Sequence, residues 1–334
     1  MILALVGATA TGKSTLAVEI ARALVADGQP AEIVNGDSML VYRGMDIGTA
    51  KPTVDERGGV PHHLIDIMDV TQTASVAQFQ TWARDAIADC QARGVLPIVV
   101  GGSALYVHAV LDEMDFPGTD PAVRARWEAE LAAVGPEKLH DELARRDPAA
   151  AAAILPGNGR RIVRALEVIE LTGGYTATLP EPTYALPDVV QIGLSIDRTV
   201  LDERIDARVE AMWAAGFVDE VRALEAQGLR EGLTAARALG YRQVLEFLDG
   251  QISEDEAKAA TKQATRRFAR KQDGWFRRDH RIQWQPWDAV DLLETAVGRV
   301  GSLEWVDKGN VEQPEMLDIA GCHRQSVASG ARGD

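Results

Sequence analysis

The residue types and spacing most clearly suited to chemistry stand near the N-terminus. Residues 7–14 read Gly-Ala-Thr-Ala-Thr-Gly-Lys-Ser, which matches the pattern G-x-x-x-x-G-K-[ST]. Glycines let the backbone curl so that successive N–H groups point at phosphate oxygens, and a lysine adds a full positive charge. The hydroxyl of Ser14 is a suitable ligand for Mg²⁺, which we expect as the cofactor. The predicted phosphate-binding loop consists of Gly7, Ala8, Thr9, Ala10, Thr11, Gly12, Lys13 and Ser14.

A carboxylate follows the next apolar run. Residues 31–35 have the character of a buried strand, and Asp37 opens a glycine-rich segment that extends to Pro52. Ligands of open α/β sheets bind at the carboxyl ends of strands, so this segment is well placed for function. Two interpretations of Asp37 stay open on chemistry alone. It is either a helix N-cap, or a catalytic or Mg²⁺-linked group.

The surrounding elements support a nucleotide-type sheet but not an ordinary ATPase. An apolar strand at 2–6 precedes the glycine loop and a helix at 15–24 follows it, while a further strand at 95–100 ends in Gly101-Gly102-Ser103. ATPases usually carry an aspartate at that strand end, and Asp66 is an imperfect substitute. A small-molecule kinase or another diphosphate user is therefore favoured. His62–Ile67 alternates like a strand, so His62 and His63 point to opposite faces and are poorly placed to chelate one ion.

Residues 117–187 differ in pattern from the segments on either side. Helices are expected near Pro121–Val134, from Pro136, from Pro148 and over Arg160–Thr172, with no strand pattern until residues 189–196. We predict an α/β fold in which residues 1–116 and 188–305 form a parallel sheet flanked by helices. An all-helical insertion occupies residues 117–187, and residues 306–334 form a disordered tail. Within the insertion, Arg160, Arg161 and Arg164 lie near one helix face and favour phosphate binding.

Charge is distributed unevenly along the chain. The net charge of −15 over 334 residues opposes nucleic-acid binding, but residues 262–281 hold eight basic residues against two acidic ones. Lys262, Arg266 and Arg270 form one row on a predicted helix, which we expect to contact a polyanion. No apolar run has membrane-spanning length, and no signal peptide is recognised. The two cysteines, Cys90 and Cys322, suit a reducing compartment, so a cytoplasmic protein without membrane partners is expected.

Several longer motifs resemble the tRNA dimethylallyltransferases, also called tRNA isopentenyltransferases. The resemblance covers roughly residues 1–285 and includes the glycine loop and Val-Gly-Gly-Ser at 100–103. The long segment Asp-Ser-Met-Leu-Val-Tyr-Arg-Gly-Met-Asp-Ile-Gly-Thr-Ala-Lys-Pro at 37–52 is more specific than the loop alone. The resemblance also includes two further segments, Arg-Arg-Ile-Val-Arg-Ala-Leu-Glu-Val at 160–168 and Arg-Ala-Leu-Gly-Tyr-Arg-Gln at 237–243.

This resemblance implies a P-loop-kinase-like α/β core with an inserted helical domain. It also implies transfer of a dimethylallyl group from dimethylallyl diphosphate to N6 of the adenosine that follows the tRNA anticodon (position 37), with Mg²⁺. It implies Asp37 as the general base, with Ser14 and Arg208 on the diphosphate. It further implies tRNA contacts by Asp37, Ser38, Met39, Leu40, Ser103, Arg124, Arg160, Arg161, Ile162, Val163, Arg164, Arg237, Ala238, Leu239, Gly240, Tyr241 and Arg242. We expect a monomer with tRNA and dimethylallyl diphosphate as partners. A P-loop nucleotide or metabolite kinase, and an RNA-binding module with an inactive loop, are the competing hypotheses.

Overall fold

A parallel sheet of six strands forms the centre of the protein, and the computed structural model describes residues 1–177 and 180–301. The strand order is β3-β2-β4-β1-β5-β6, and every neighbouring pair is parallel. The strands are β1 (Ile2–Val6), β2 (Ala31–Asn35), β3 (His62–His63), β4 (Leu96–Gly101), β5 (Val189–Ser195) and β6 (Ile282–Pro286). All strands therefore end at one edge, where the glycine loop follows β1 and Asp37 follows β2.

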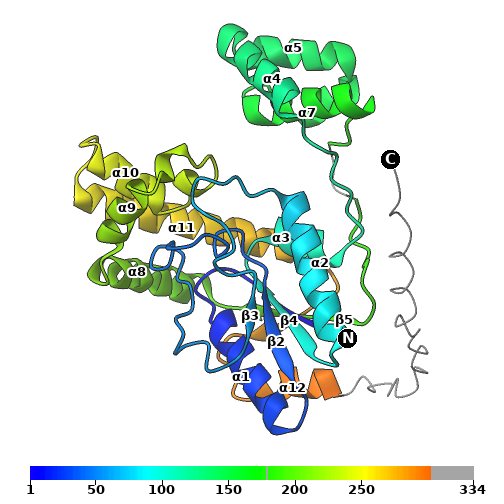
Figure 1. Ribbon diagram of the computed structural model, residues 1–334, viewed down its shortest axis with the longest axis vertical. Helices are drawn as coiled ribbons and strands as arrows, with labels where there is room; N and C mark the ends of the chain where they lie inside the picture. The colour runs from blue at the N-terminus through cyan, green and yellow to red at the C-terminus, as the bar shows by residue number, and fades with distance from the viewer. Residues whose placement is uncertain (178–179, 302–334) are drawn as a thin grey trace, which may run out of the picture.

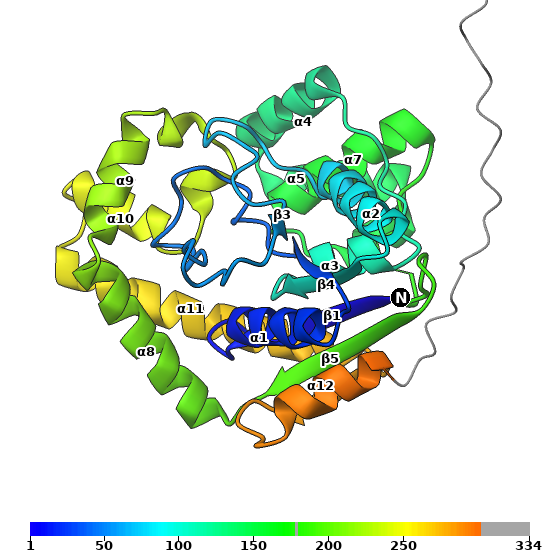
Figure 2. The same ribbon diagram turned by 60° about the horizontal axis from the view of Figure 1, so that its bottom comes forward.

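Helices cover both faces of this sheet, because the alternating side chains of each buried strand are apolar on both sides. In β1, Leu3 and Leu5 pack with α1 (Lys13–Ala26) and α12 (Leu292–Gly301). Ile2, Ala4 and Val6 point to the opposite face. That face packs against α2 (Val76–Ala92) and α3 (Ala104–Leu111), and its core continues into α9 (Phe217–Glu225) and α10 (Tyr241–Leu248). Two longer helices, α8 (Arg198–Ala214) and α11 (Glu254–Phe276), lie beside the glycine loop (Figure 2).

Four helices between β4 and β5 form a separate cluster. They are α4 (Pro121–Val134), α5 (Pro136–Arg146), α6 (Pro148–Ala153) and α7 (Gly159–Thr172). The cluster lies apart from the sheet (Figure 1), and its helices share their own apolar core. The side chains of Asp120, Asp147 and Asn158 cap three of these helices at their first turns. Backbone bonds between residues 111–113 and 183–185 pair the chain that enters this cluster with the chain that leaves it. The cluster is thus joined to the sheet by a paired double connection.

Most elements lie where the sequence predicts them, and the predicted fold class is confirmed. Three differences are instructive. The strand expected over 62–67 is limited to His62–His63, because Leu64 and Asp66 adopt positive φ angles of 62° and 58° that turn the chain. Helix α11 continues through Gly274 to Phe276, although glycine commonly ends a helix. The short strand β6 and the 3₁₀ turns at Leu229–Glu231 and Ala235–Arg237 were not expected. The tail predicted over 306–334 lies outside the described residues.

Within residues 1–177 and 180–301, no helix has the length and apolar character needed to cross a lipid bilayer.

Candidate active site

The glycine loop takes the shape of a phosphate cradle at the start of α1. Gly7 and Gly12 have φ angles of 141° and 95°, and Ala10 between them has a φ of 64°. A left-handed alanine is strained by about 1–2 kcal/mol, so neighbouring contacts must hold it. Ser14 is exposed in the first turn of α1, and its hydroxyl makes no hydrogen bond among the described residues. A hydroxyl that is accessible and unengaged fits the role of Mg²⁺ ligand.

Lys13 and Asp37 influence each other across the loop. Burial, followed by the charge of Arg208, lowers the pKa of Lys13 to about 7, and the nearby Asp37 acts in the opposite direction. Burial also raises the pKa of Asp37, although a hydrogen bond from the Met39 N–H and the charge of Lys13 oppose the rise. A carboxylate with a raised pKa beside a phosphate loop is suited to accept a proton.

Asp37 is not a helix N-cap, because no helix follows it. Its Oδ1 accepts the Met39 N–H at 2.8 Å in a local turn, and its own N–H donates to Oδ1 of Asn35 at 2.8 Å. The amide of Asn35 in turn binds the carbonyls of Asp37 and Leu64 at 2.9 and 3.0 Å. These bonds fix the backbone and leave Oδ2 without a protein donor among the described residues. One of the two open interpretations is thereby removed.

Two arginines of α8 form hydrogen bonds with the glycine loop. Arg208 Nη1 donates to the Thr9 hydroxyl at 3.3 Å, and Arg204 Nε donates to the Ala10 carbonyl at 2.8 Å. They lie one helical turn apart, so both project from one side of α8. Burial, followed by the charge of Arg204, lowers the pKa of Arg208. The loop therefore gathers three cationic side chains around a site that a diphosphate would neutralise.

The glycines at the end of β4 allow close packing between the loop and Asp37. A Cβ on Gly101 would lie 2.5 Å from the carbonyl oxygen of Gly36, the residue before Asp37. A Cβ on Gly102 would lie 2.6 Å from Nε2 of Gln272. Asp66, considered in place of the aspartate usual at this strand end, is instead ion-paired to Lys51 at 2.5 Å. The Gly-Gly pair thus serves packing, and the carboxylate associated with the loop is Asp37.

The segment after Asp37 is anchored by Glu220 of α9. The Glu220 carboxylate accepts the backbone N–H groups of Asp46, Ile47 and Gly48 at 3.0, 2.6 and 3.2 Å. It also accepts the Tyr241 hydroxyl at 2.6 Å, and Tyr241 is fully buried. Within residues 237–242, the buried residues Ala238, Gly240 and Tyr241 belong to the core beneath this segment. Arg237 and Arg242 are exposed, and Leu239 is half-buried. The side chain of Tyr241 has no exposed surface, so the burial of this residue does not support the expected tRNA contact, which stays a prediction.

The arginines of the insertion have different roles. Arg161 binds the Ala177 carbonyl at 2.6 Å, and Arg164 binds the Pro117 carbonyl at 2.6 Å, so both hold the double connection. Arg164 and Arg124 also pair with the buried carboxylate of Glu167, at 2.8 and 3.4 Å. Ile162 and Val163 are buried in the insertion core, so their side chains do not support the expected tRNA contact.

Arg160 is the member of this group whose charge influences a residue of the sheet domain. It is exposed, and its charge acts on the hydroxyl of Tyr106 in α3, the same hydroxyl that the charge of Asp37 influences. Burial, the first of these causes, raises the pKa of Tyr106 to about 12. Ser103 precedes α3 and is half-buried, as are Ser38, Met39 and Leu40 beside Asp37. The structure thus places Arg160, Ser103 and the 37–40 segment around one region.

The basic row on α11 faces α8 instead of standing free. Lys262, Arg266 and Arg270 pair in order with Glu210, Asp206 and Asp202, which form a matching row on α8. The numbering rises on one helix and falls on the other, so the helices are antiparallel. The expectation that this row contacts a polyanion is not supported, because its charges are already balanced.

A different face of α11 carries unpaired positive charge. Arg267 and Lys271 on α11, and Arg278 in the turn just after it, are exposed and form no ion pair within the part of the chain that the structure describes. Phe268 and Trp275 stand among them with 41% and 38% of their surface exposed. Exposed aromatic rings between cations are typical of surfaces that bind single-stranded nucleic acid. We call these five residues the outer face of α11.

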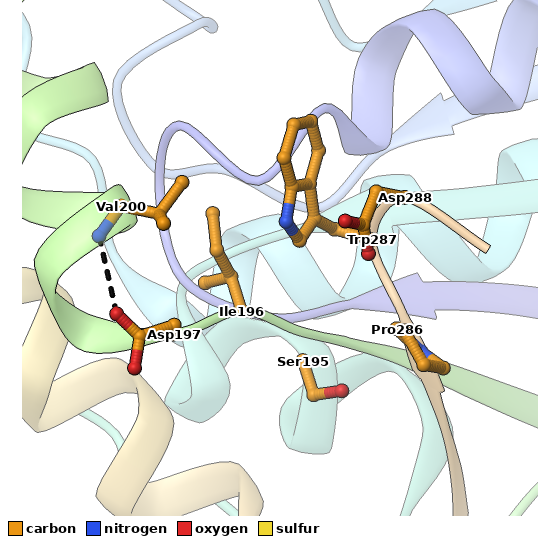
Figure 3. Close-up of a pocket in the computed structure, with 7 residues that line it drawn as sticks. All are labelled: Ser195, Ile196, Asp197, Val200, Pro286, Trp287 and Asp288. Carbon is orange, nitrogen blue, oxygen red and sulfur yellow. Dashed lines mark hydrogen bonds between the residues drawn. The ribbon is translucent and has the colours of Figure 1, made fainter.

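Two further features lie away from this site. Glu32, His63 and Cys90 come within ligand distance of one another, but Arg93 binds both carboxylate oxygens of Glu32 at 2.8 and 2.7 Å. The Glu32 carboxylate is therefore already paired with Arg93, which disfavours a metal ion at this cluster. A shallow hollow lies at the ends of β5 and β6 and the start of α8, between Ile196 and Trp287 (Figure 3). Its link to the glycine loop is Arg204, whose guanidinium lies 4.2 Å from the centroid of the Trp287 ring.

Comparison with known proteins identifies the family. The family model described as IPP transferase matches residues 40–279. A tRNA dimethylallyltransferase of Cutibacterium acnes is 62% identical over 299 residues, covering 90% of this chain and 94% of the relative. This chain belongs to the IPP transferase family.

Solved structures agree with this assignment. The tRNA isopentenylpyrophosphate transferase of Bacillus halodurans is 40% identical, with a TM-score of 0.66 over 90% of this chain and 95% of that one. A eukaryotic dimethylallyltransferase, described as acting on tRNA, is 24% identical with a TM-score of 0.74 over 90% of this chain and 77% of that one, which shows the shared fold. The sequence and its resemblance to the IPP transferase family pointed to the loop, Asp37 and Arg208, which the structure brings close together, and their catalytic roles stay predictions. Sequence reasoning missed Glu220 and Gln272, because no local motif marks a residue that acts across the fold.

Proposed function

We propose that this protein transfers a dimethylallyl group from dimethylallyl diphosphate to N6 of adenosine 37 in tRNA and releases diphosphate. The observation that carries the proposal is the placement of a half-buried carboxylate, Asp37, beside a phosphate loop lined by Lys13 and Arg208. Such a loop can hold a leaving group as well as a transferred phosphoryl group. Membership of the IPP transferase family supports this substrate class.

The proposed roles of the site residues follow from their charges. Breaking the allylic C–O bond places negative charge on the departing diphosphate, and Lys13, Arg208 and the loop N–H groups stabilise that charge. Asp37 accepts the N6 proton as the new C–N bond forms, through its unengaged Oδ2. Ser14 would hold Mg²⁺, which when bound neutralises diphosphate charge. Because the target base must leave its stack, the region between Arg160 and Asp37 is the proposed entry.

The outer face of α11 and the exposed Arg160, Arg237 and Arg242 are the proposed tRNA contacts. These side chains are exposed and unpaired or weakly paired, so they form local positive patches on a protein whose net charge is negative. Such patches support binding to tRNA phosphates. We propose that the protein acts in the cytosol, where tRNA is available, and as a monomer.

One assay separates the competing functions. The purified protein is incubated with Mg²⁺, radiolabelled dimethylallyl diphosphate and unmodified tRNA, alongside the same tRNA carrying guanosine at position 37. Label is expected only on the tRNA with adenosine 37. A parallel reaction with γ-labelled ATP tests the kinase hypothesis. Binding of tRNA without any transfer would instead indicate an RNA-binding module.

A further inference from the structure

One buried side chain outside the motifs contacts the glycine loop directly. Oε1 of Gln272 in α11 accepts the Thr9 N–H at 2.9 Å, across 263 residues of chain. Gln272 is 4% exposed. Its Nε2 is buried and has no hydrogen-bond partner among the described residues. The Gln272 side chain of α11 is therefore held against the glycine loop by a hydrogen bond from the loop backbone.

The chain makes room for this amide. A Cβ on Gly102 would lie 2.6 Å from Nε2 of Gln272 and 3.3 Å from the carbonyl oxygen of Gly7. Gln272 therefore lies over the ends of β1 and β4, between the two strands that flank the phosphate cradle. Any larger residue at position 102 would push the amide away from Thr9.

Thr9 is held from two helices at once. Its N–H is bound by Gln272 of α11, and its hydroxyl accepts from Arg208 of α8 at 3.3 Å. The next residue, Ala10, has the left-handed φ of 64°, and its carbonyl accepts from Arg204. The strained alanine is thus bracketed by contacts from α8 and α11, which are themselves joined by the ion-pair row.

We propose that Gln272 is a positioning residue that keeps the loop in its phosphate-binding shape by fixing Thr9 and thereby the left-handed Ala10. The inference rests on the proposed function, since it assumes that a diphosphate occupies this loop. Glycine adopts positive φ without strain, so a loop with glycine at position 10 would need this support less. The role of Gln272 is therefore testable through its coupling to residue 10.

The experiment is a double-mutant cycle on ligand binding. Affinity for inorganic diphosphate with Mg²⁺ is measured by titration calorimetry for the wild type, Gln272→Met, Ala10→Gly and the double variant. Methionine keeps the length of the side chain and removes both polar atoms. We expect Gln272→Met to weaken binding about tenfold when position 10 is alanine and at most about threefold in the Ala10→Gly background, because leaving the Thr9 N–H without its acceptor costs about 1.4 kcal/mol, which is a factor of ten.

Thr261→Val provides a matched control for stability. Thr261 is also buried in α11, but its hydroxyl binds Ala257 in its own helix at 2.8 Å and does not contact the loop. It should lower the thermal midpoint to an extent similar to Gln272→Met and leave diphosphate affinity unchanged. The KM for dimethylallyl diphosphate should follow the binding result, with a smaller change in the KM for tRNA.

The outcomes separate the inference from the function. Equal losses of affinity in the two backgrounds, or no loss in either, would overturn the positioning role while leaving the proposed function intact. A wild-type protein that binds no diphosphate would overturn the function and this inference together.

Discussion

Arg266 of α11 and Asp206 of α8 form a two-contact ion pair, with Nε lying 2.9 Å from Oδ1 and Nη2 bonded to Oδ2. It is the middle pair of the row that joins the two helices flanking the glycine loop. Both partners are about one-third exposed. An ion pair this exposed adds little to the free energy of unfolding. Its two contacts instead fix how far along α8 the helix α11 is placed.

The first prediction compares the two faces of α11. Changing Arg267, Lys271 and Arg278 to glutamine should weaken tRNA binding and flatten its salt dependence, by roughly 0.7–0.9 in slope for each phosphate that the protein no longer neutralises. Changing Lys262, Arg266 and Arg270 in the same way is the matched control, since it removes equal charge from the paired row. Affinities of both triple variants are measured across a salt series. Equal slopes for the two variants would mean that net charge, and not the outer face, governs binding.

The second prediction concerns the proposed base. Asp37→Asn keeps an oxygen that can accept the Met39 N–H, so the local turn should persist. Turnover should fall by about 10²–10⁴, while tRNA affinity stays within a few-fold, because only the proton acceptor is removed. Single-turnover transfer and tRNA binding are measured on the same preparation. Near-normal product formation would show that Asp37 is structural.

The third prediction follows from the pKa of Lys13, which burial and then Arg208 lower to about 7. A bound diphosphate favours the charged form, so binding above pH 7 requires proton uptake. Affinity for inorganic diphosphate should fall as pH rises above 7, by up to about tenfold per pH unit. Lys13→Met should bind weakly and lack that contribution to the pH dependence, and its profile supplies the correction for titration of diphosphate itself. A shared slope in both proteins would argue against the lowered pKa.

The same shift has a consequence for stability. Between about pH 7 and the ordinary lysine pKa of 10.5, the unfolded chain holds a proton that the folded protein has released. The contribution of Lys13 to the free energy of unfolding therefore rises with pH across that window. The free energies of unfolding of the wild type and Lys13→Met are measured by chemical denaturation at pH 7 and pH 9. The wild-type value minus the variant value should be larger at pH 9 than at pH 7.

The fourth prediction concerns Glu167, whose carboxylate is fully buried in the insertion and pairs with Arg164 and Arg124. Burial alone would raise the pKa of Glu167, but bonds from Thr119 and Arg164 outweigh it and lower the pKa. Glu167→Ala should destabilise the insertion by about 2–4 kcal/mol, since two arginines lose their partner. The wild-type contribution should be present at neutral pH and be lost as pH falls through the lowered pKa.

Hydrogen exchange distinguishes a local effect from a global one. Faster exchange confined to α4–α7 is expected for Glu167→Ala, because that cluster has its own core. Uniformly faster exchange through the sheet would contradict an independent insertion. Glu142→Ala is the matched control, because its carboxylate pairs with two arginines of the same cluster, Arg145 and Arg146, in a more exposed position.

The sequence by itself determined the chemistry at the loop. The order of residues 7–14 dictates a curled backbone with a lysine and a hydroxyl at its end, because glycine spacing and the following helix are local properties. The position of Asp37 after an apolar run placed it at the same sheet edge, since parallel strands end together. The apolar spacing also predicted the separate helical segment before residue 189.

Only the tertiary structure decided which charges are available. A row such as Lys262, Arg266 and Arg270 looks the same in sequence whether it faces solvent or an acidic row on a distant helix. Helical periodicity gives the members of a face but not its partner, so α8 had to be placed before that row could be interpreted. The contact between Gln272 and Thr9 is of the same kind, because its two ends meet only when α11 packs over the ends of β1 and β4.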